Sequence, residues 1–425
     1  MRFTNFAHKE RILSVSYLLM FVPYVVTILS HVFLDNVRRA AESWQVTEIL
    51  INYQGGFVRR GLVGEIIYWL HCNCGIDVMF QVYTFSILSV LIFFYLVIRD
   101  TIRRGYSVLM LPTAMLLSSL FVSGYWVRKD FFIMLLFYTV VRLLKTTGCL
   151  KYILINFLLI VGVLSHEVII FISLPILYVS MLYDCKANDK YNKNVVVWAF
   201  VRSMLCYLPT LVVSVLVLMN KGDAMVAARI WQSWHSLGVV NGDIATAIDA
   251  IGWTVARAIE TGVAVWSHVS CGVYYPFMWA ILSLIAFVIF VWMYKLKPRL
   301  CGYAPFNDFP ITESVYIILF QFLAMVPLLL VFADTSRAFF YVIMSSYIIR
   351  LYDERKVYVK IFGCLPQKIA KCTLSIDRYI ATHPRSFVAL AFVIGLPTIN
   401  VSALEHVILH GQLGFFFKSI IDIIR

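Results

Sequence analysis

NYQGGFVRRGLVG, residues 52–64, places two adjacent arginines inside a glycine-rich turn. Glycine lets the backbone turn with a positive φ or approach other groups closely. The guanidinium groups of Arg59 and Arg60 present planar sets of N–H donors that match phosphate oxygens. We therefore predict that Gly55, Gly56, Arg59 and Arg60 bind a phosphate or diphosphate. The alternative is a surface turn whose arginines reach lipid headgroups.

The composition around this turn is that of a polytopic membrane protein. Of the 425 residues, 61% are hydrophobic and 14% are charged, against about 25% charged residues in a typical soluble domain. The net charge of +13 is divided among short basic clusters between apolar runs. That pattern is typical of membrane topology signals rather than of a nucleic-acid-binding surface, so no nucleic-acid partner is expected. The sequence has no metal-ligand spacing, Walker A motif or dinucleotide fingerprint, so neither a metal nor a cofactor is expected.

Apolar runs divide the chain from one end to the other. A run of about 20 residues is long enough to cross the ~30 Å hydrocarbon core of a membrane. The runs predict an all-α fold, a single integral membrane domain over residues 1–425 with about 11 transmembrane helices. Three of the runs are short, namely 131–144, 152–165 and 338–352. The alternative to full spans is that a pair of these runs forms re-entrant or broken helices. The other runs are 12–34, 77–98, 106–126, 168–183, 195–219, 274–294, 312–333 and 386–404.

Lysine and arginine are more abundant in the segments that face the cytoplasm if the N-terminus does. The positive-inside rule therefore predicts a cytoplasmic N-terminus. Residues 35–76 then form an amphipathic outer segment, and 353–385 form a basic cytoplasmic loop. The large outer loop 220–272 contains helical stretches around 223–235 and 243–261, and we expect it to form a small helical cap.

Four polar clusters fall on the outer face in this topology. Charges at the outer ends of spans oppose the positive-inside preference and mark a functional site, so the clusters are candidates for one shared site. We predict that Arg128, Lys129 and Arg337 contact the same anion as the arginine turn. The alternatives are a solvated turn between helices and an ion pair of Arg337 with Asp334 within one helix. The clusters are Arg59-Arg60, Arg128-Lys129-Asp130, His166-Glu167 and Asp334-Thr335-Ser336-Arg337.

The candidate catalytic residues are acids and one histidine. His166 beside Glu167 is suited to proton transfer near neutral pH; the alternative is a hydrogen-bonded pair at a helix end. Asp334 is a candidate for orienting Arg337 or for acting as a base. Asp35 directly follows the first span, where an acid can activate an attacking hydroxyl.

In general form the chain resembles the O-antigen polymerases (the Wzy class) of bacterial surface polysaccharide assembly. The resemblance rests on the apolar and aromatic-rich chain of about eleven spans with one large outer loop. The Gly55–Gly64 arginine turn and the two polar clusters that follow it resemble uncharacterised bacterial membrane proteins found with such systems. The resemblance to the polymerases implies a metal-independent glycosyltransferase of the bacterial inner membrane. This enzyme transfers oligosaccharide repeat units between undecaprenyl diphosphate carriers and so extends O-antigen or a similar polysaccharide.

The resemblance also implies roles and partners. Arginines would stabilise the departing lipid diphosphate, and a base would take the proton of the acceptor hydroxyl. Membrane lipid and a chain-length regulator are the further partners that it implies. The class often carries key arginines in two large outer loops, whereas the large loop here has only Arg229 and Arg257.

Two other functions stay open. A lipid-phosphate-sugar-dependent glycosyltransferase of the C-type fold has an acidic residue in the first outer loop. Asp35 fits that position, although the paired Asp-Asp or Glu-Asp signature is missing. A transporter of lipid-linked oligosaccharide would carry charges along its whole lumen, whereas charge within the spans here is sparse.

Overall fold

Helices make up all the regular structure that is described for this protein. The structure is a computed structural model, and within its described part the all-α prediction is confirmed. Some predicted spans and two predicted acids lie outside the described residues. They are the spans 12–34, 106–126, 274–294 and 386–404 and the acids Asp35 and Asp334. The structure describes residues 41, 43–103, 127–188, 194–267, 311–331, 335–352 and 357–363, and the single residues 375, 420, 421 and 424.

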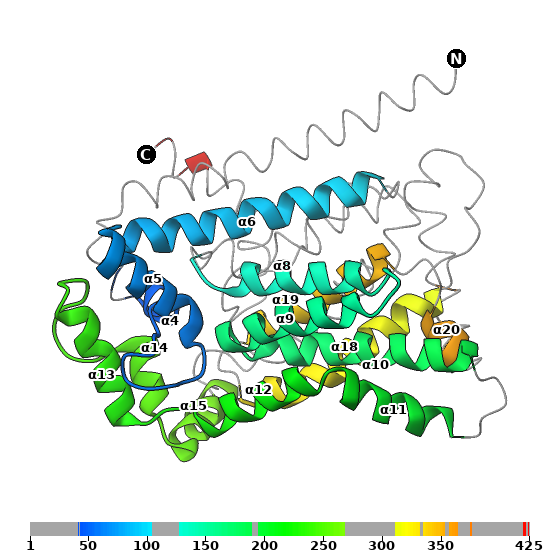
Figure 1. The fold of residues 1–425 in the computed structure, drawn as a ribbon. Coiled ribbons are helices and arrows are strands. Elements are labelled where there is room, and N and C mark those ends of the chain that lie inside the picture. The colour runs from blue at the N-terminus through cyan, green and yellow to red at the C-terminus, as the bar shows by residue number, and fades with distance from the viewer. Residues whose placement is uncertain are drawn as a thin grey trace.

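Long apolar helices pack side by side into a bundle (Figure 1). The helix α8 (Asp130–Leu143) contacts α6 (Val78–Arg103), α9 (Leu150–Ser165), α10 (Val168–Asn188) and α19 (Thr335–Tyr352), so it lies at the centre. These helices begin and end close to the predicted runs, because apolar runs and the charges that flank them are local features of the sequence.

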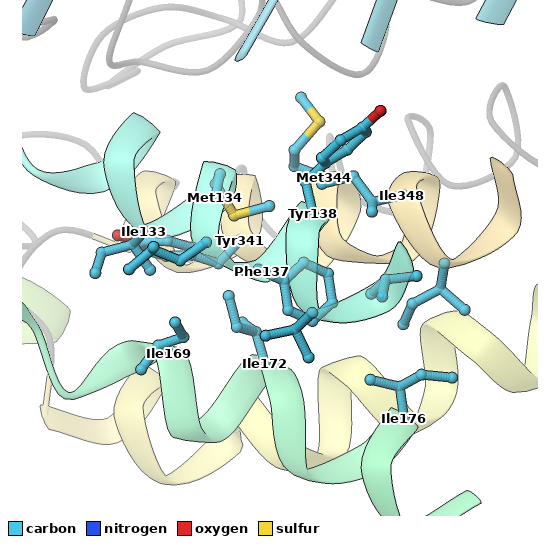
Figure 2. Close-up of a cluster of buried hydrophobic side chains, with 14 of the residues drawn as sticks. Ile133, Met134, Phe137, Tyr138, Ile169, Ile172, Ile176, Tyr341, Met344 and Ile348 are labelled. Atoms are coloured by element: carbon cyan, nitrogen blue, oxygen red, sulfur yellow. The ribbon is translucent and has the colours of Figure 1, made fainter. Parts of the chain in front are cut away.

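The middle of the bundle is a layer of buried apolar side chains (Figure 2). Ile133, Met134 and Phe137 of α8 meet Ile172 of α10 and Met344 of α19 there, and all five side chains are completely buried. Lipid is as apolar as these side chains, so within a membrane their close packing, rather than removal from water, holds the helices together.

Two further helices complete the bundle beside α10. The helix α18 (Ile311–Val331) packs against α19 and α10, and α20 (Val357–Phe362) packs against α10 and α18. The helix α20 lies within the predicted loop 353–385, most of which is outside the described residues.

The predicted span 195–219 is bent, as a broken span or a re-entrant loop is. Within it, α11 (Val195–Cys206) and α12 (Leu208–Met219) meet at a bend of 70°. Pro209 lies at the start of α12, and a proline has no N–H with which to continue a helix. The side chain of Asn156, from α9, fills the break: it donates to the carbonyl of Cys206 at 2.8 Å and accepts from the Thr210 hydroxyl at 2.7 Å. Such a break is tolerated in a membrane because a neighbouring helix satisfies the freed backbone groups.

The described residues contain a few helices that are long and apolar enough to cross a membrane. Two qualify, Val78–Thr101 and Val168–Ala187, and a third does if α11 and α12 count as one span. Other helices are apolar but shorter, as Leu150–Ser165 is. This supports a membrane protein but does not support the count of about 11 spans.

Five helices gather at one end of the bundle, and we call them the cap (Figure 1). They are α4 (Trp44–Ile49), α5 (Gly61–Cys74), α13 (Ala224–His235), α14 (Thr246–Asp249) and α15 (Val255–Ser267); the short 3-10 helix η2 (Ala250–Gly252) follows α14. The predicted helical cap of loop 220–272 is therefore confirmed, but it also includes the helices of the segment 35–76.

Hydrogen bonds between distant segments hold the cap together. The buried Trp234 donates from its indole Nε1 to the carbonyl of Leu50 at 2.7 Å. The hydroxyls of Thr47 and Thr246 lie 2.7 Å apart. The cap therefore joins the first predicted outer segment to the large outer loop.

The segments predicted to be cytoplasmic meet at the opposite end. The Lys145 ammonium lies 5.2 Å from the centre of the Tyr352 ring, and the Lys186 ammonium donates to the carbonyl of Ile361 at 3.0 Å. The structure thus sorts the predicted outer and cytoplasmic segments to two ends, while the side of the membrane that each end faces stays a prediction.

Candidate functional site

Charged side chains meet where the cap joins the bundle, and we call them the ionic cluster. Five stretches far apart in the sequence supply them. Among the described residues the cluster has five basic side chains and three carboxylates, so positive charge is in excess. Its members are Glu48, Arg59, Arg60, Arg128, Lys129, Asp130, His166, Glu167, Arg337 and Tyr341.

Arg337 is buried between two carboxylates. Its guanidinium donates to both oxygens of Asp130, with Nη2 2.9 Å from Oδ2, and Nη2 also lies 3.0 Å from Glu48 Oε1. The hydroxyl of Tyr341, one turn further along α19, donates to Asp130 as well. Asp130 lies in the first turn of α8, where the helix dipole stabilises a carboxylate. The two acids therefore neutralise Arg337 without any ligand.

Arg60 forms the second buried pair. Its Nε lies 2.9 Å from Glu167 Oε2 and its Nη2 lies 2.5 Å from Glu167 Oε1, which is a bidentate arrangement. The backbone of Arg60 has φ 66° and ψ 10°, a left-handed conformation that costs a non-glycine residue about 1–2 kcal/mol. The Lys129 ammonium donates to the Arg60 carbonyl at 2.7 Å and so helps to hold this backbone. Strained backbone of this kind gathers at functional sites.

Steric contacts and backbone conformation explain why glycine occupies several positions of the arginine turn. A Cβ on Gly64 would lie 2.1 Å from the carbonyl oxygen of Ile51, and one on Gly55 would lie 2.5 Å from the carbonyl oxygen of Val226 in α13. Gly56 has φ +117°, which an L side chain rarely adopts. Packing alone thus accounts for Gly55, and a phosphate-binding role for Gly55 and Gly56 stays a prediction.

Arg59 differs from its neighbour because it is accessible. Its side chain is 36% exposed, and its nearest carboxylate contact is Glu167 Oε1 at 3.9 Å from Nη1. Its backbone N–H donates to the carbonyl of Asn220 at 3.1 Å, which ties the turn to the end of α12. The left-handed residue between Arg59 and α5 therefore separates one arginine that points inward from one that a ligand can reach.

Glu48 and His166 face each other at the centre of the cluster. His166 Nε2 lies 3.5 Å from Glu48 Oε1, too far for a good hydrogen bond. The Val168 N–H donates to Nδ1 at 3.3 Å, so we assign the proton of neutral His166 to Nε2. Glu48 Oε2 and His166 Nε2 are buried and have no hydrogen-bond partner among the described residues. Unsatisfied polar atoms of this kind are rare in proteins and indicate a place for a polar ligand or a water.

The surroundings change the proton affinities of the cluster. Burial, helped by the Arg60 charge, lowers the pKa of His166 to about 4, so it is neutral at pH 7. Burial lowers the pKa of the Lys129 ammonium to about 7. Burial alone would raise the pKa of the Glu48 and Glu167 carboxyls, but the neighbouring arginines outweigh it and hold both well below the usual value. The two glutamates are therefore ionised at pH 7.

The structure places the predicted charged site residues that it describes close to the arginine turn. Arg60, Lys129, His166, Glu167 and Arg337 are in the cluster through the contacts given above. Arg59 lies at its edge, and Arg128 acts electrostatically on Glu48 and Asp130. The predicted acids Asp35 and Asp334 lie outside the described residues.

Tyr341 is a member that reasoning from sequence missed, and Glu48 is one of the acids of the segment 35–76, among which reasoning from sequence favours Asp35. Glu48 lies in α4, and its side chain is 1% exposed. The available signal is local: this acid stands directly before the apolar run Ile49-Leu50-Ile51, just upstream of the arginine turn. A lone acid in apolar surroundings is expected to pair with a buried cation.

A second polar network lies at the opposite end of the bundle. Tyr138 donates to Asp100, which also accepts from Arg99 Nε at 2.9 Å, and Tyr352 donates to Tyr138 at 2.6 Å. Along α8, the buried Ile133, Met134 and Phe137 come between Asp130 of the ionic cluster and Tyr138 of this network. In the part of the chain that the structure describes, no group of three or more His, Cys, Asp or Glu side chains is arranged to hold a metal.

Comparison of the chain with models of protein families, with curated proteins and with solved structures finds no match. The functional argument therefore rests on the geometry of the ionic cluster.

Proposed function

We propose that the ionic cluster binds the phosphate or diphosphate of a lipid-linked sugar, and that the protein is a polysaccharide polymerase of the O-antigen type. The observation that carries this proposal is that, among the described residues, five basic side chains gather with three carboxylates at one largely buried site, with the Arg59 side chain 36% exposed at its edge. A buried ion pair at best balances the cost of removing its two charges from water. An anionic ligand beside Arg59 adds a further partner for this positive charge.

The geometry supports different roles for the two arginines of the turn. Arg60 is held by Glu167 and Glu48 and shapes the site. Arg59, with its side chain 36% exposed, is the guanidinium that contacts the lipid diphosphate. Arg128 and Lys129 add positive charge behind it. Together they stabilise the negative charge that develops as the diphosphate leaves.

By position Glu48 is the candidate proton acceptor, because it is ionised and its Oε2 is buried without a hydrogen-bond partner among the described residues, although the arginines that lower its pKa also make it a weak base. In the proposed reaction an acceptor sugar hydroxyl attacks the anomeric carbon of the donor. The bond from that carbon to the diphosphate oxygen breaks, and the hydroxyl proton passes to Glu48. His166, neutral with its proton at Nε2, orients the hydroxyl or the carboxylate as a hydrogen-bond donor.

The wider setting is part of the same proposal. The chain has about 11 spans and a cytoplasmic N-terminus, in the inner membrane of a bacterium. The cap end then faces outward, where undecaprenyl diphosphate-linked oligosaccharides and a chain-length regulator are its partners. The grouping of the predicted outer segments at the cap end supports this topology.

A C-type glycosyltransferase is the second candidate, and one observation favours it. Glu48 comes from the first predicted outer segment, 35–76, and enters the cluster. An acidic residue from that segment is what the C-type resemblance implies. A transporter is less well supported, because buried apolar side chains occupy α8 between Asp130 and Tyr138 in the described part of the bundle.

The proposal is tested with Arg59→Ala in a bacterium whose own copy of the gene is deleted. We expect long polysaccharide chains to disappear while single lipid-linked repeat units are still made, at normal protein level. Arg229→Ala is the matched control, because Arg229 is exposed on α13 and outside the cluster. A normal chain-length distribution in Arg59→Ala would refute the proposal.

The product distinguishes the two enzymes. Loss of long chains with retained repeat units indicates a polymerase, whereas loss of one side-branch sugar indicates a C-type transferase. Asp35→Asn and Glu48→Gln are compared in the same strain, since either acid is a candidate base. If Asp35→Asn were inactive and Glu48→Gln active, the catalytic base would be Asp35, which lies outside the described residues.

A further inference from the structure

The helix α15 exposes an apolar stripe. Val255, Ile259 and Val263 are 60%, 55% and 57% exposed. Residues spaced by four lie on one face of a helix, so the three side chains form a continuous line along it. Large apolar side chains are likewise exposed on α11, α12 and α18, which the sequence assigns to membrane spans.

The polar side of α15 is tied to the cap. The Arg257 guanidinium lies 4.7 Å from the centre of the Trp253 ring, and its Nη2 lies 3.5 Å from Asp249 Oδ2. Asp249 also accepts from the indole Nε1 of Trp253 at 2.8 Å. By helical spacing Arg257 lies opposite Val255 and Ile259. These contacts fix the rotation of α15, so its apolar stripe points away from the cap.

We propose that α15 lies on the membrane surface and inserts this stripe among the lipids. A few residues after α15 the chain enters the apolar run 274–294, which the sequence predicts to be a membrane span. The helix also packs against α18, an apolar helix whose Leu319 and Leu323 are exposed. The helix that carries the stripe therefore lies beside a helix that exposes apolar side chains of its own.

The chemistry of α15 favours lipid over a second protein. Arg257 and Glu260 give the helix no net charge, so binding depends on apolar insertion and not on anionic headgroups. A stable dimer needs about 800 Å² of buried surface on each partner, far more than three side chains supply. The helix then holds the cap against the membrane surface, beside the ionic cluster. This inference does not depend on the proposed enzyme activity.

The test measures the surroundings of α15 in the full-length protein. The nine native cysteines are replaced by alanine, and Ile259→Cys or Val263→Cys is labelled with a nitroxide after reconstitution into phosphatidylcholine vesicles. Glu260→Cys, on the polar side of the same helix, is the matched control. Electron paramagnetic resonance then compares collisions of each label with oxygen, which dissolves in lipid, and with a water-soluble nickel complex.

We expect the labels at positions 259 and 263 to collide several-fold more with oxygen than with nickel, and the label at 260 to show the reverse. Equal nickel access at 259, 263 and 260 would place the stripe in water and overturn the proposal. Low access to both reagents with broadening between labels would show a second copy of the chain and would also overturn it. A variant that does not elute like the cysteine-free parent is replaced by the label at the other stripe position.

Discussion

Asp130→Asn tests whether the ionic cluster is a network of mutually dependent buried charges. The Asp130 carboxylate is completely buried and accepts hydrogen bonds from Arg337 and Tyr341. Asparagine keeps the shape of the side chain, but it removes the negative charge and turns an N–H₂ group toward donors. Removing one partner of a buried ion pair costs about 3–5 kcal/mol. Arg337 retains Glu48 at 3.0 Å, so we expect the lower end, about 3 kcal/mol.

The free energy of unfolding is measured by denaturant titration in detergent micelles. Asp249→Asn is the matched control, because Asp249 and Arg257 are 33% and 59% exposed and 3.5 Å apart. A pair as exposed as this contributes about 0–1 kcal/mol.

The double variant Asp130→Asn with Arg337→Gln separates the pair from other effects. Removing both charges leaves neither member of this pair buried alone, and Glu48 keeps Arg60 at 3.7 Å, so the double variant should be more stable than the sum of the single variants implies, by about 1–3 kcal/mol. If Asp130→Asn were no less stable than Asp249→Asn, the cluster would not be a buried ionic network, and the argument from its excess charge would fail.

Two further predictions concern the turn and its lysine. Gly64→Ala places a Cβ 2.1 Å from the Ile51 carbonyl oxygen, so it should lower the free energy of unfolding by about 1–3 kcal/mol in the same titration. The control Ile66→Ala, on the exposed side of α5, should change this free energy little. Equal effects of the two variants would contradict the close packing of α5. The pKa of Lys129 is about 7 in the folded protein and 10.5 is its ordinary value, so the unfolded chain binds more protons between these pH values and stability should rise with pH. From pH 7 to 9 the Lys129 contribution is about 2 kcal/mol, which Lys129→Met should remove; an unchanged pH dependence in that variant would place the lysine in water.

Most of the bundle could be predicted from the sequence because its signals are local. The bounds of α8, Asp130–Leu143, follow from an apolar run that begins after a charged turn. The break between α11 and α12 could not be predicted in the same way. Pro209 weakens the helix, but the Asn156 side chain from α9 is what satisfies the bent backbone. A straight or a broken span therefore depends on a neighbour that no window of sequence contains.

The candidate site, too, could be predicted from the sequence only in part. What the sequence by itself provided is the prediction that Arg59-Arg60, Lys129, His166-Glu167 and Arg337 share one face, because topology is predicted from the order of apolar runs and flanking charges. Only the tertiary structure decided how these groups pair. It buried Arg60 against Glu167 and left Arg59 accessible.

Glu48 shows the physical reason most clearly. In the sequence it is one acid on a short helix, and its neighbours along the chain say nothing of its partners. In the fold it lies within 4 Å of Arg337, Arg60 and His166, which come from three other stretches. Charges attract through space over a few ångströms, so the partners of a buried acid, and with them its chemistry, are decided by the packing of the helices that carry them.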